Sequence, residues 1–433
     1  MRYVPRPRAS IAILFLPAML WPQTHATGVW KGSQCSGDKC QAIVLRVDGD
    51  SKKATVDLPD FGALDIPASR FALDAGRVHF ELVGDETTVV FEGTVAAQSI
   101  RGNWKEPNRS GEFHLARAPD TQAQVRKEDV SFQNGGVRLA GTLLLPATKS
   151  RTPAIVFVQG AGPETRSASR FLAEYFASRG MAALIYDKRG AGASTGDWQH
   201  SSFEDLAGDT DAALDYLKKR PEVDPARVGM FGSSQGGWIA PLAATRTSRV
   251  CFVVVKSAAG VTPEEQELVQ VEINMRRNGD SEERIQTALA LYRQMIAYSR
   301  TRQNWDALSS AMKAASDKYQ LSFGNDIEQD WWFFDFIQLT FSYDPVPVLE
   351  QVQSPLLIVF GGKDRFLPLD RSVARLSTAL GTSRSAVIQV FPNAGHDLRV
   401  EPAKDSAWDF PRFAPGYLET VASWVQLQTQ TCQ

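Results

Sequence analysis

The residue with the clearest chemical potential in this sequence is Ser234, which lies in the pentapeptide 232–236, Gly-Ser-Ser-Gln-Gly. A G-x-S-x-G match is weak by itself, since ordinary glycine and serine frequencies produce one by chance in roughly one chain in six of this length. The context is more specific, because an apolar segment at 228–231 precedes the serine and a helical pattern at 238–245 follows it. A serine in a strained strand-to-helix turn is typical of an acyl-transfer nucleophile. The sequence therefore predicts Ser234 as a nucleophile rather than as part of a simple glycine-rich turn.

A serine hydroxyl needs help from a base, normally a histidine that a carboxylate orients. The chain has five histidines. His396 lies in a loop directly after an apolar segment that ends near Val390, and such loops meet at the carboxyl edge of a parallel sheet. The others are less suitably placed: His25 in the N-terminal leader, His79 and His114 in a β-rich region, and His200 in a polar segment before the serine. His396 is thus predicted as the base, against the alternative of an ordinary surface-loop histidine.

Two carboxylates compete for the role of orienting the histidine. Asp364 follows the apolar segment 356–360 and falls between Ser234 and His396, the chain order expected when the nucleophile comes first. Asp397 is adjacent to the histidine itself. Neighbouring residues on a loop rarely place their side chains for a mutual hydrogen bond, which favours Asp364.

Negative charge that develops on the substrate oxygen needs preorganised N–H donors. The backbone amide of Gln235 is one candidate, because it stands at the start of the helix after the serine. The second should come from the turn 159–163, with Ala161 preferred and Gly160 as the alternative. No Gly-Lys-Ser or Gly-Lys-Thr follows that turn, and no spacing of His, Cys or carboxylates suits a metal. We therefore expect neither a cofactor nor a metal.

From residue 129 to the C-terminus, short apolar segments alternate with helical patterns. This alternation predicts an α/β domain whose mostly parallel sheet is covered on both faces. It breaks at about 261–347, where long charged and aromatic stretches predict an inserted helical cap. The run 331–336 is too apolar to face water, so it either packs inside the cap or lines a substrate site. The segment 187–192 mixes charges with glycines and is predicted as a tight turn locked by its Asp or Arg.

Residues 27–118 show a different pattern, in which apolar and polar residues alternate in short segments between turn residues. This alternation indicates antiparallel strands. We expect a small β barrel or sandwich, with Trp30 and Trp104 closing its core. Fold alone does not reveal whether such a domain is a structural addition or binds a ligand. A polar stretch at 119–128 is predicted as the linker to the α/β domain at 129–433.

Composition and the N-terminus limit the partners of the chain. The 433 residues hold 47 basic and 49 acidic side chains, a net charge of −2, which argues against nucleic acid or an anionic membrane surface as a partner. Three arginines precede an apolar run at 11–21, which is too short to span a bilayer. Residues 1–26 are therefore predicted as a cleaved signal peptide of an exported, periplasmic or secreted protein without stable membrane insertion. No feature of the sequence indicates the oligomeric state.

The four cysteines occur in different settings. Cys35 and Cys40 lie close together after the leader, in a compartment that permits oxidation, so a small surface disulfide is a reasonable hypothesis. Cys251 opens an apolar stretch and is predicted to be a buried, inert thiol. Cys432 is expected in a frayed tail.

Four motifs carry a resemblance to a known family: 160–163 together with Arg166, 186–190, 194–196 and 232–237. With them the chain resembles the bacterial EstD-like esterases of the α/β-hydrolase superfamily, which are related to serine aminopeptidases and prolyl-oligopeptidase-type enzymes. The similarity covers roughly residues 130–427. It implies an α/β-hydrolase fold with an inserted cap, in which a preceding small antiparallel β domain is familiar. It also implies the following site: Ser234, Asp364 and His396 as a catalytic triad, and Gln235 and Ala161 as the oxyanion hole.

The resemblance implies a carboxylesterase, which the aromatic cap suggests acts on a small-molecule ester with an apolar group. Gln159 and Ala161 depart from the family pattern, which often has histidine and serine there, but a backbone donor does not depend on the side chain. A serine aminopeptidase or oligopeptidase is the main alternative. The charged terminus of a peptide substrate could be captured by three glutamates of the cap, Glu264, Glu265 and Glu267. A solvated helix face explains these glutamates equally well. A less favoured alternative is a ligand-binding protein with an inert hydrolase domain.

Overall fold

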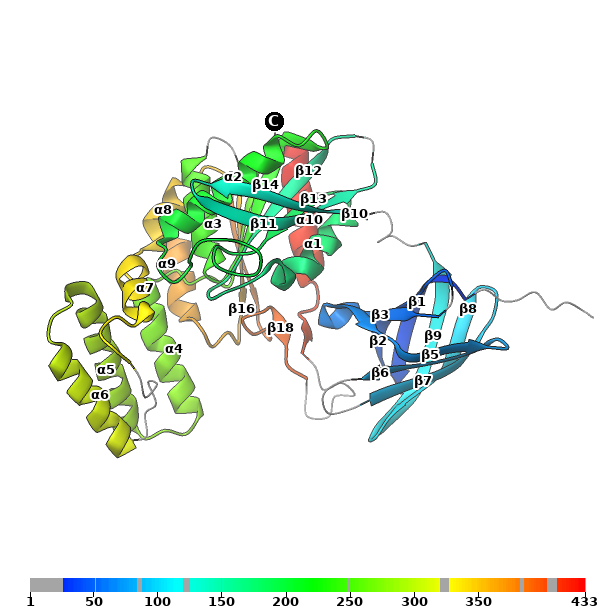
Figure 1. Ribbon diagram of the computed structural model, residues 1–433, viewed down its shortest axis with the longest axis horizontal. Coiled ribbons are helices and arrows are strands. Elements are labelled where there is room, and N and C mark those ends of the chain that lie inside the picture. Colours follow the sequence, from blue (N-terminus) through cyan, green and yellow to red (C-terminus); the bar gives the residue numbers. More distant parts are fainter. Residues whose placement is uncertain are drawn as a thin grey trace, which may run out of the picture. The chain divides into compact units, whose positions relative to one another are not determined.

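The computed structural model describes residues 26–50, 52–83, 88–119, 125–148, 150–247, 250–319, 327–381, 385–402 and 411–432 (Figure 1). The chain divides into two compact units. The first holds the described residues up to Asp57 together with Asp65–Ala118, and the second holds Leu58–Leu64 and the described residues from Pro119 onward. The predicted signal peptide lies outside the described residues, apart from Ala26.

The first unit is built on one antiparallel sheet with the strand order β4-β3-β2-β1-β9-β8-β7-β6-β5. All the strands belong to one continuous sheet, and β4 and β5 are its edge strands. Trp30 and Trp104 are buried in it as expected, and Phe80 stacks on Phe91 at 4.4 Å between ring centroids. The strands are β1 (Gly28–Ser36), β2 (Lys39–Val47), β3 (Ala54–Leu58), β4 (Ala63–Pro67), β5 (Ser69–Asp74), β6 (Arg77–Val83), β7 (Thr88–Val95), β8 (Ser99–Glu106) and β9 (Arg109–Ala118). The short 3-10 helix η1 (Pro59–Phe61), between β3 and β4 in the sequence, belongs to the second unit.

Cys35 and Cys40 are directly opposite each other on β1 and β2 and form a disulfide, as the sequence suggested.

The second unit carries the α/β fold predicted from the alternation of apolar and helical segments. Its eight-stranded sheet has the order β10-β11-β13-β12-β14-β15-β16-β17. The β10–β11 hairpin and the β11–β13 pair are antiparallel, and all later pairs are parallel. The strands are β10 (Val125–Asn134), β11 (Val137–Pro146), β12 (Thr152–Val158), β13 (Ala182–Tyr186), β14 (Val223–Ser233), β15 (Val253–Lys256), β16 (Leu356–Gly361) and β17 (Ala386–Phe391), and β18 (Arg399–Val400) pairs with β19 (Arg412–Phe413) in a separate ladder. β10 begins inside the stretch that the sequence suggested as a linker.

Helices cover both faces of this sheet. β13 and β16 are buried along their whole length and β12 at all but one residue, with no alternation, as a parallel sheet between two helical layers requires. One core contains side chains of α2, α3, α8 and α9, and the other contains side chains of α1 and α10. These helices are α1 (Arg170–Ala177), which follows the 3-10 helix η2 (Arg166–Ser169), α2 (Phe203–Lys218), α3 (Gly236–Arg246), α8 (Pro345–Gln351), α9 (Leu369–Leu380) and α10 (Tyr417–Thr431).

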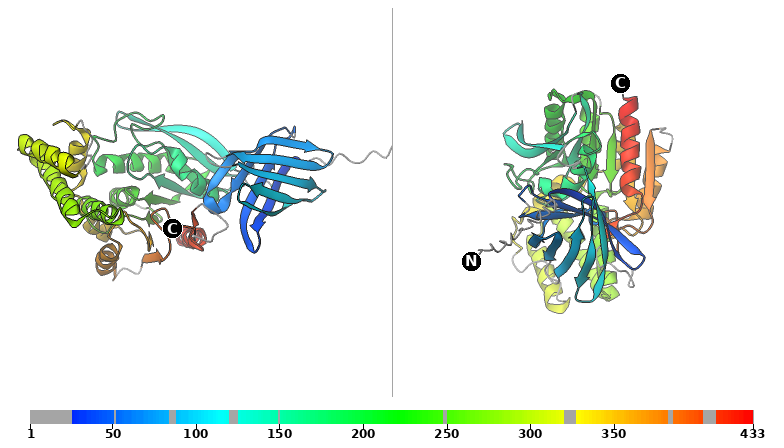
Figure 2. Two further views of the ribbon diagram at one scale, coloured as in Figure 1. Left: turned by 90° about the horizontal axis from the view of Figure 1, so that it is seen from below. Right: turned by 90° about the vertical axis from the view of Figure 1, so that its right-hand side faces the viewer.

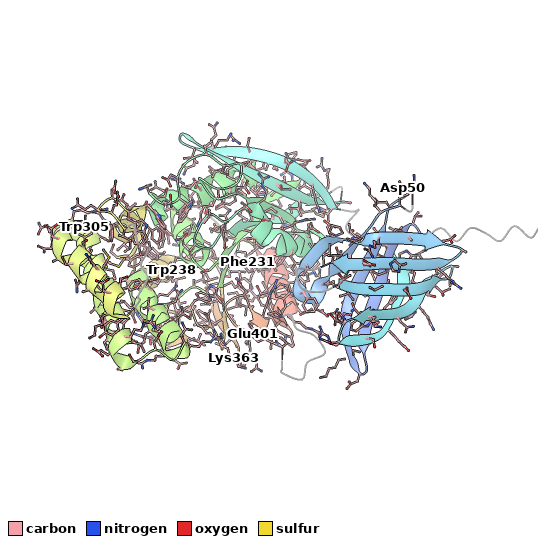
Figure 3. The ribbon with its side chains drawn as sticks, turned by 60° about the horizontal axis from the view of Figure 1, so that its bottom comes forward. Asp50, Phe231, Trp238, Trp305, Lys363 and Glu401 are labelled. Carbon is pink, nitrogen blue, oxygen red and sulfur yellow. A yellow bond between two sulfur atoms is a disulfide. The ribbon has the colours of Figure 1, made fainter. Side chains whose placement is uncertain are left out.

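A helical cap is inserted between β15 and β16, in agreement with the expected break at about 261–347. Its helices are α4 (Pro263–Arg277), α5 (Glu282–Thr301), α6 (Trp305–Tyr319) and α7 (Trp332–Thr340). α4, α5 and α6 lie side by side (Figure 1, Figure 2), and Trp305 packs in the core of the cap (Figure 3). α4 begins at Pro263 because the Thr262 side chain accepts a hydrogen bond from the Glu265 N–H at 3.2 Å.

The expectation of a frayed tail at Cys432 is wrong. α10 continues to Thr431, and Cys432 is half-buried against the core that this helix shares with the sheet. Cys251 is buried, as predicted. Among the described residues, no helix combines the length and the apolar character that crossing a membrane requires. The same residues contain no cluster of three or more metal-ligating side chains.

Candidate active site

Ser234 lies in a strained turn between β14 and α3. Its φ of +53° is in the left-handed region, which a serine adopts only when the surroundings impose it. The Ser234 N–H donates to the Lys256 carbonyl at 2.8 Å, which fixes the turn to β15. A Cβ atom on Gly232 would lie 2.0 Å from the Gly236 carbonyl oxygen, and one on Gly236 would lie 2.2 Å from the Val158 carbonyl oxygen. The two glycines are therefore required by close backbone approach, as the motif suggested.

His396 and Asp364 meet at the same end of the sheet. The His396 Nδ1 lies 2.8 Å from Asp364 Oδ2, and because a carboxylate only accepts, the imidazole Nδ1–H is the donor. The Asp364 side chain is fully buried, and its Oδ1 accepts from the Phe366 N–H at 2.8 Å. The Phe366 ring lies against the imidazole at 4.8 Å between ring centroids. The carboxylate thus holds the histidine in one tautomer and leaves Nε2 free of this contact.

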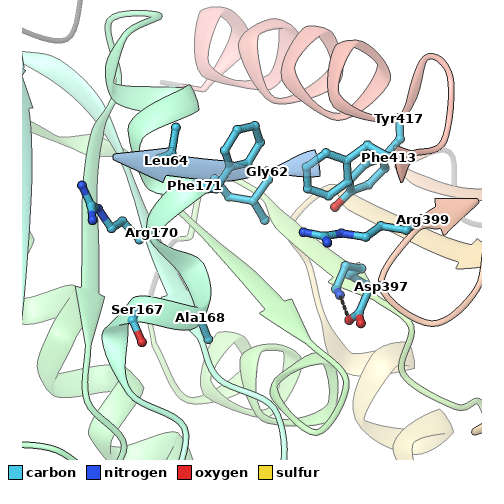
Figure 4. A pocket seen from close by; sticks show the side chains of 12 residues that line it. Gly62, Leu64, Ser167, Ala168, Arg170, Phe171, Asp397, Arg399, Phe413 and Tyr417 are labelled. Carbon is cyan, nitrogen blue, oxygen red and sulfur yellow. Dashed lines mark hydrogen bonds and ion pairs between the residues drawn. The ribbon is translucent and has the colours of Figure 1, made fainter. Parts of the chain in front are cut away.

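Asp397, the competing carboxylate, makes a different contact. Its side chain is 76% exposed and pairs with Lys256 Nζ at 3.5 Å (Figure 4). Arg170 and Arg399 line the neighbouring cavity of about 500 Å³ that Figure 4 shows. Burial lowers the pKa of Lys256, and Asp397 opposes that shift. The geometry therefore joins His396 to Asp364, as the sequence favoured, rather than to Asp397.

One cavity of about 360 Å³ brings the predicted site residues together between the sheet and the cap. Ser234 and His396 both line it, as do Gln235 and Ala161. Its apolar wall comes from the core and the cap: Phe203, Trp238, Phe336, Phe341 and Phe366. Trp238, labelled in Figure 3, belongs to α3 of the α/β core.

Different side chains of the aromatic run 331–336 pack inside the cap and line the cavity. Phe334 is fully buried in the core of the cap with Tyr298 and Trp305. Phe336, two residues later, lines the cavity with Ser234. One short helix, α7, therefore stabilises the cap and also shapes the site.

The two predicted oxyanion donors lie on opposite turns of the cavity. Within the described part of the chain, neither the Gln235 N–H nor the Ala161 N–H has a hydrogen-bond acceptor. The alternative donor, the Gly160 N–H, is already bound to Glu164 Oε2 at 2.7 Å. This bond disfavours Gly160 and leaves the two preferred amides free to bind an anionic oxygen.

A buried lysine links these two turns. Lys188 Nζ donates to Gln235 Oε1 at 2.7 Å and also to the Gly160 carbonyl oxygen. Burial lowers the pKa of Lys188 to about 8, although the nearby Glu164 and Asp209 carboxylates oppose the shift. A single ammonium group thus fixes the distance between the turns that carry both candidate oxyanion donors.

The end of β15 holds the nucleophile turn and the histidine loop together. Lys256 accepts from the Ser234 N–H, and the hydroxyl of the next residue, Ser257, donates to the His396 carbonyl at 2.6 Å. Ser257 has a φ of +53°, so its own backbone is also constrained. Two adjacent residues therefore position the serine and the histidine.

The segment after β13 is structural, as predicted. Asp187 accepts from Arg166 Nε at 3.0 Å and from Arg166 Nη2 at 2.9 Å, and also from the Ala193 N–H at 3.0 Å. Desolvation raises the pKa of Asp187, but the hydrogen bonds from Arg166 and Ala193 outweigh it and lower the pKa. Arg189 forms a second buried ion pair with Asp209, at 2.7 Å. These contacts lock the turn to its neighbours.

Three glutamates of the cap could capture the charged terminus of a peptide substrate. They differ in the partners of their side chains. Glu264 is paired with Arg300, and Glu265 is paired with Arg371 at 2.5 Å. Glu267 lines the cavity with Ser234, and burial raises its pKa. In the part of the chain that the structure describes, no ion pair or hydrogen bond engages Glu267.

Sequence reasoning missed several residues of this site. Phe366 and Glu164 come from loops whose direction depends on long-range packing. Lys188 could have been found, because it comes two residues after a fully buried strand and therefore lies at the carboxyl edge of the sheet, beside the other loops of the site.

Residues 149–403 match the family model described as "Serine aminopeptidase, S33". The chain belongs to this family of α/β-hydrolases. Membership of the S33 family agrees with the sheet, the inserted cap and the serine turn. The narrower resemblance to EstD-like esterases stays a prediction.

Curated relatives of this S33-family chain match it over part of their length. The "Quorum-quenching protein AidA" of Acinetobacter baumannii is 32% identical over 127 residues, which are 29% of this chain and 42% of that protein. The "Uncharacterized peptidase YuxL" of Bacillus subtilis is 22% identical over 302 residues, which are 67% of this chain and 37% of YuxL. The chain spans about two fifths of the length of these relatives. Among solved structures, an esterase from Pyrococcus furiosus has a TM-score of 0.44 at 15% identity, with 73% of this chain and 94% of that chain covered.

Proposed function

We propose that this S33-family hydrolase is a serine carboxylesterase in which Ser234 is the nucleophile, His396 the general base and Asp364 the residue that orients the base. The observation that carries the proposal is the 2.8 Å hydrogen bond from His396 to a fully buried Asp364, beside a cavity that Ser234 also lines. Because the sequence predicts a leader, we also propose that the enzyme acts after export.

In the proposed reaction, His396 Nε2 takes the proton of the Ser234 hydroxyl as the oxygen attacks the acyl carbon of the ester. The negative charge on the carbonyl oxygen is bound by the N–H groups of Gln235 and Ala161. His396 then gives the proton to the leaving alcohol, and an acyl-enzyme forms. A water molecule, activated by the same imidazole, releases the acid and restores Ser234.

The apolar wall of the cavity supports an ester with an apolar acyl or alcohol group as the substrate. Trp238, Phe336 and Phe341 would remove the apolar part of such a substrate from water, and each buried methylene contributes about 0.8 kcal/mol. Ester chain length should therefore change kcat/KM in steps until the cavity of about 360 Å³ is filled.

The function is tested with a panel of p-nitrophenyl esters from acetate to decanoate, measured beside aminoacyl p-nitroanilides on the same enzyme preparation. We expect labelling by a fluorophosphonate probe and turnover of the short to medium esters. Turnover of the anilides at rates that match the esters would overturn the esterase proposal in favour of a peptidase. A protein that the probe leaves unlabelled and that cleaves neither class would support the binding-protein alternative.

Glu267 supports an aminopeptidase as the second candidate, because its unpaired carboxylate would suit a substrate with a free amino group. Under that alternative, Glu267→Gln lowers kcat/KM for alanine p-nitroanilide by roughly 10-fold or more, the value of a lost charged hydrogen bond. Under the esterase proposal, we expect Glu267→Gln to leave kcat/KM for p-nitrophenyl butyrate within about threefold of wild type, because no charged contact to the ester is lost. The two substrates are measured on both proteins, with the paired Glu264→Gln as the matched control.

Lys188 gives a further prediction, since it joins the turns that carry both proposed oxyanion donors. Lys188→Met should lower kcat for esters by about 10- to 100-fold and change KM much less, because displaced donors weaken binding of the transition state more than that of the substrate. The ammonium charge is lost as the pH rises through about 8, so kcat of the wild type should fall above that pH.

The measurement is a pH–rate profile of both proteins between pH 6 and 10, values chosen to bracket that pKa of about 8. The alkaline fall should be absent in Lys188→Met. The matched control is Lys363→Met, which changes an exposed lysine and should keep the wild-type profile. An unchanged kcat and an unchanged alkaline limb in Lys188→Met would remove this role from Lys188.

A further inference from the structure

Cys251 and Cys432 are far apart in the sequence but lie together in the fold. Cys251 precedes β15, where its N–H donates to the Val228 carbonyl at 2.8 Å. Cys432 directly follows α10. Both pack in the core between α10 and the sheet, and both line one cavity of about 560 Å³. The chain brings two free thiols to the same place.

The carbonyl oxygen of Gln428 shows how close the two residues are. This oxygen accepts from the Cys432 N–H at 3.0 Å and from the Cys251 thiol at 3.6 Å. An atom that contacts both residues places them side by side. Burial, and then the hydrogen bond with the Cys432 thiol, raise the pKa of the Cys251 thiol.

The two thiols differ in exposure in a way that sets an order of reaction. Cys251 is 2% exposed, whereas Cys432 is half-buried at the wall of the cavity. A disulfide reagent would therefore meet Cys432 first. Polar side chains also line the cavity, among them Gln351, Gln353 and Ser354, so a polar reagent could enter it.

We propose that Cys251 and Cys432 form a second disulfide that joins the end of α10 to the start of β15. The oxidant is a disulfide compound, such as glutathione disulfide. The Cys432 thiolate attacks one sulfur of the oxidant, forms a mixed disulfide and releases the first reduced thiol. The Cys251 thiolate then attacks the Cys432 sulfur, forms the internal bond and releases the second reduced thiol. Two protein thiols are oxidised, one disulfide is reduced, and the two protons pass to the released thiolates.

This bond would close a large loop that contains the whole cap. The loop also contains the turns that carry Asp364 and His396, because both lie between the two cysteines in the sequence. Cross-links that close long loops restrict the unfolded chain most. The Cys35–Cys40 disulfide, in contrast, closes a short hairpin in the other unit. The second disulfide would therefore contribute much more to the stability of the hydrolase unit than the first.

The bond is tested on the full chain in which Cys35 and Cys40 are both replaced by alanine, so that only two thiols remain. The protein is incubated with glutathione disulfide, denatured and treated with an alkylating reagent, and its peptides are analysed by mass spectrometry. We expect no alkylation and one linked pair of peptides that contain Cys251 and Cys432. Two alkylated cysteines after this treatment would overturn the proposal, and so would glutathione held on Cys432 with a free Cys251.

A stability measurement gives a second, independent test. Reduction should lower the Tm of the oxidised protein by about 5 °C, the order expected for a cross-link of this kind. Adding Cys432→Ala should remove the redox dependence, and because this residue is only half-buried the variant should still fold. A Tm that does not change on reduction while the linked peptides are present would overturn the stabilising role. Both readouts are independent of the proposed esterase activity.

Discussion

Replacement of Ser234 by alanine should lower kcat for p-nitrophenyl butyrate by roughly 10⁶-fold, the loss found when a serine nucleophile of this kind is removed. The reason is that alanine leaves His396 with no hydroxyl to activate, so no acyl-enzyme can form. The residual activity should come from binding and from the Gln235 and Ala161 amides, which act on an attacking water molecule. A steady-state assay with the wild type measured in parallel gives the ratio.

The neighbouring Ser233 is the matched control, because the pentapeptide contains two serines in sequence. Ser233 ends β14 with an ordinary strand conformation, whereas Ser234 alone has the left-handed backbone of the turn. Ser233→Ala should keep kcat within about tenfold of wild type and should still react with a fluorophosphonate probe. Labelling that persists in Ser234→Ala would show that another residue is the nucleophile.

Asp364→Asn should have the second-largest effect, a loss of about 10⁴-fold in kcat, which corresponds to about 5.5 kcal/mol of transition-state stabilisation. An asparagine at this position can donate to Nδ1 and so stabilise the wrong tautomer of His396. It also removes the negative charge that stabilises the imidazolium. KM for the ester should change little, because Asp364 is buried behind the histidine.

Asp397→Asn tests whether a nearby carboxylate, and not Asp364, orients His396. Asp397 is adjacent to His396 in sequence but pairs with Lys256, and its side chain is largely exposed. We therefore expect a loss of less than about tenfold in kcat, as for an exposed ion pair. If Asp397→Asn were the more damaging of the two substitutions, the assignment of the orienting carboxylate would have to be reversed.

The parts of the site that could be predicted from the sequence are those fixed by local chemistry. The glycines around Ser234 are dictated by backbone contacts within a few residues and between adjacent strands. Asp364 follows β16 and His396 follows the neighbouring parallel strand β17, so parallel strand order alone carries them to one edge of the sheet. Elimination among five histidines was enough to select His396.

Other features could not be predicted because they depend on contacts between distant segments. The single antiparallel sheet of the first unit depends on the pairing of β1 with β9, from opposite ends of that unit. The division of α7 between the cap core and the cavity depends on the rotation of the helix about its axis, which its run of consecutive aromatic residues does not reveal. The sequence predicts a frayed tail at Cys432 because the pattern of α10 does not show what the end of this helix packs against.

The paired hydrogen bonds at the end of β15 couple the serine turn to the histidine loop. Lys256 and Ser257 hold the serine turn and the histidine loop from adjacent positions on one backbone segment. A displacement of that segment would carry both reacting side chains with it, and their separation would change little. The cap starts at Pro263, six residues after Ser257, so a movement of the cap that reached the core through this connection would act on the two groups together. Opening for substrate entry and alignment for bond cleavage need not therefore oppose each other.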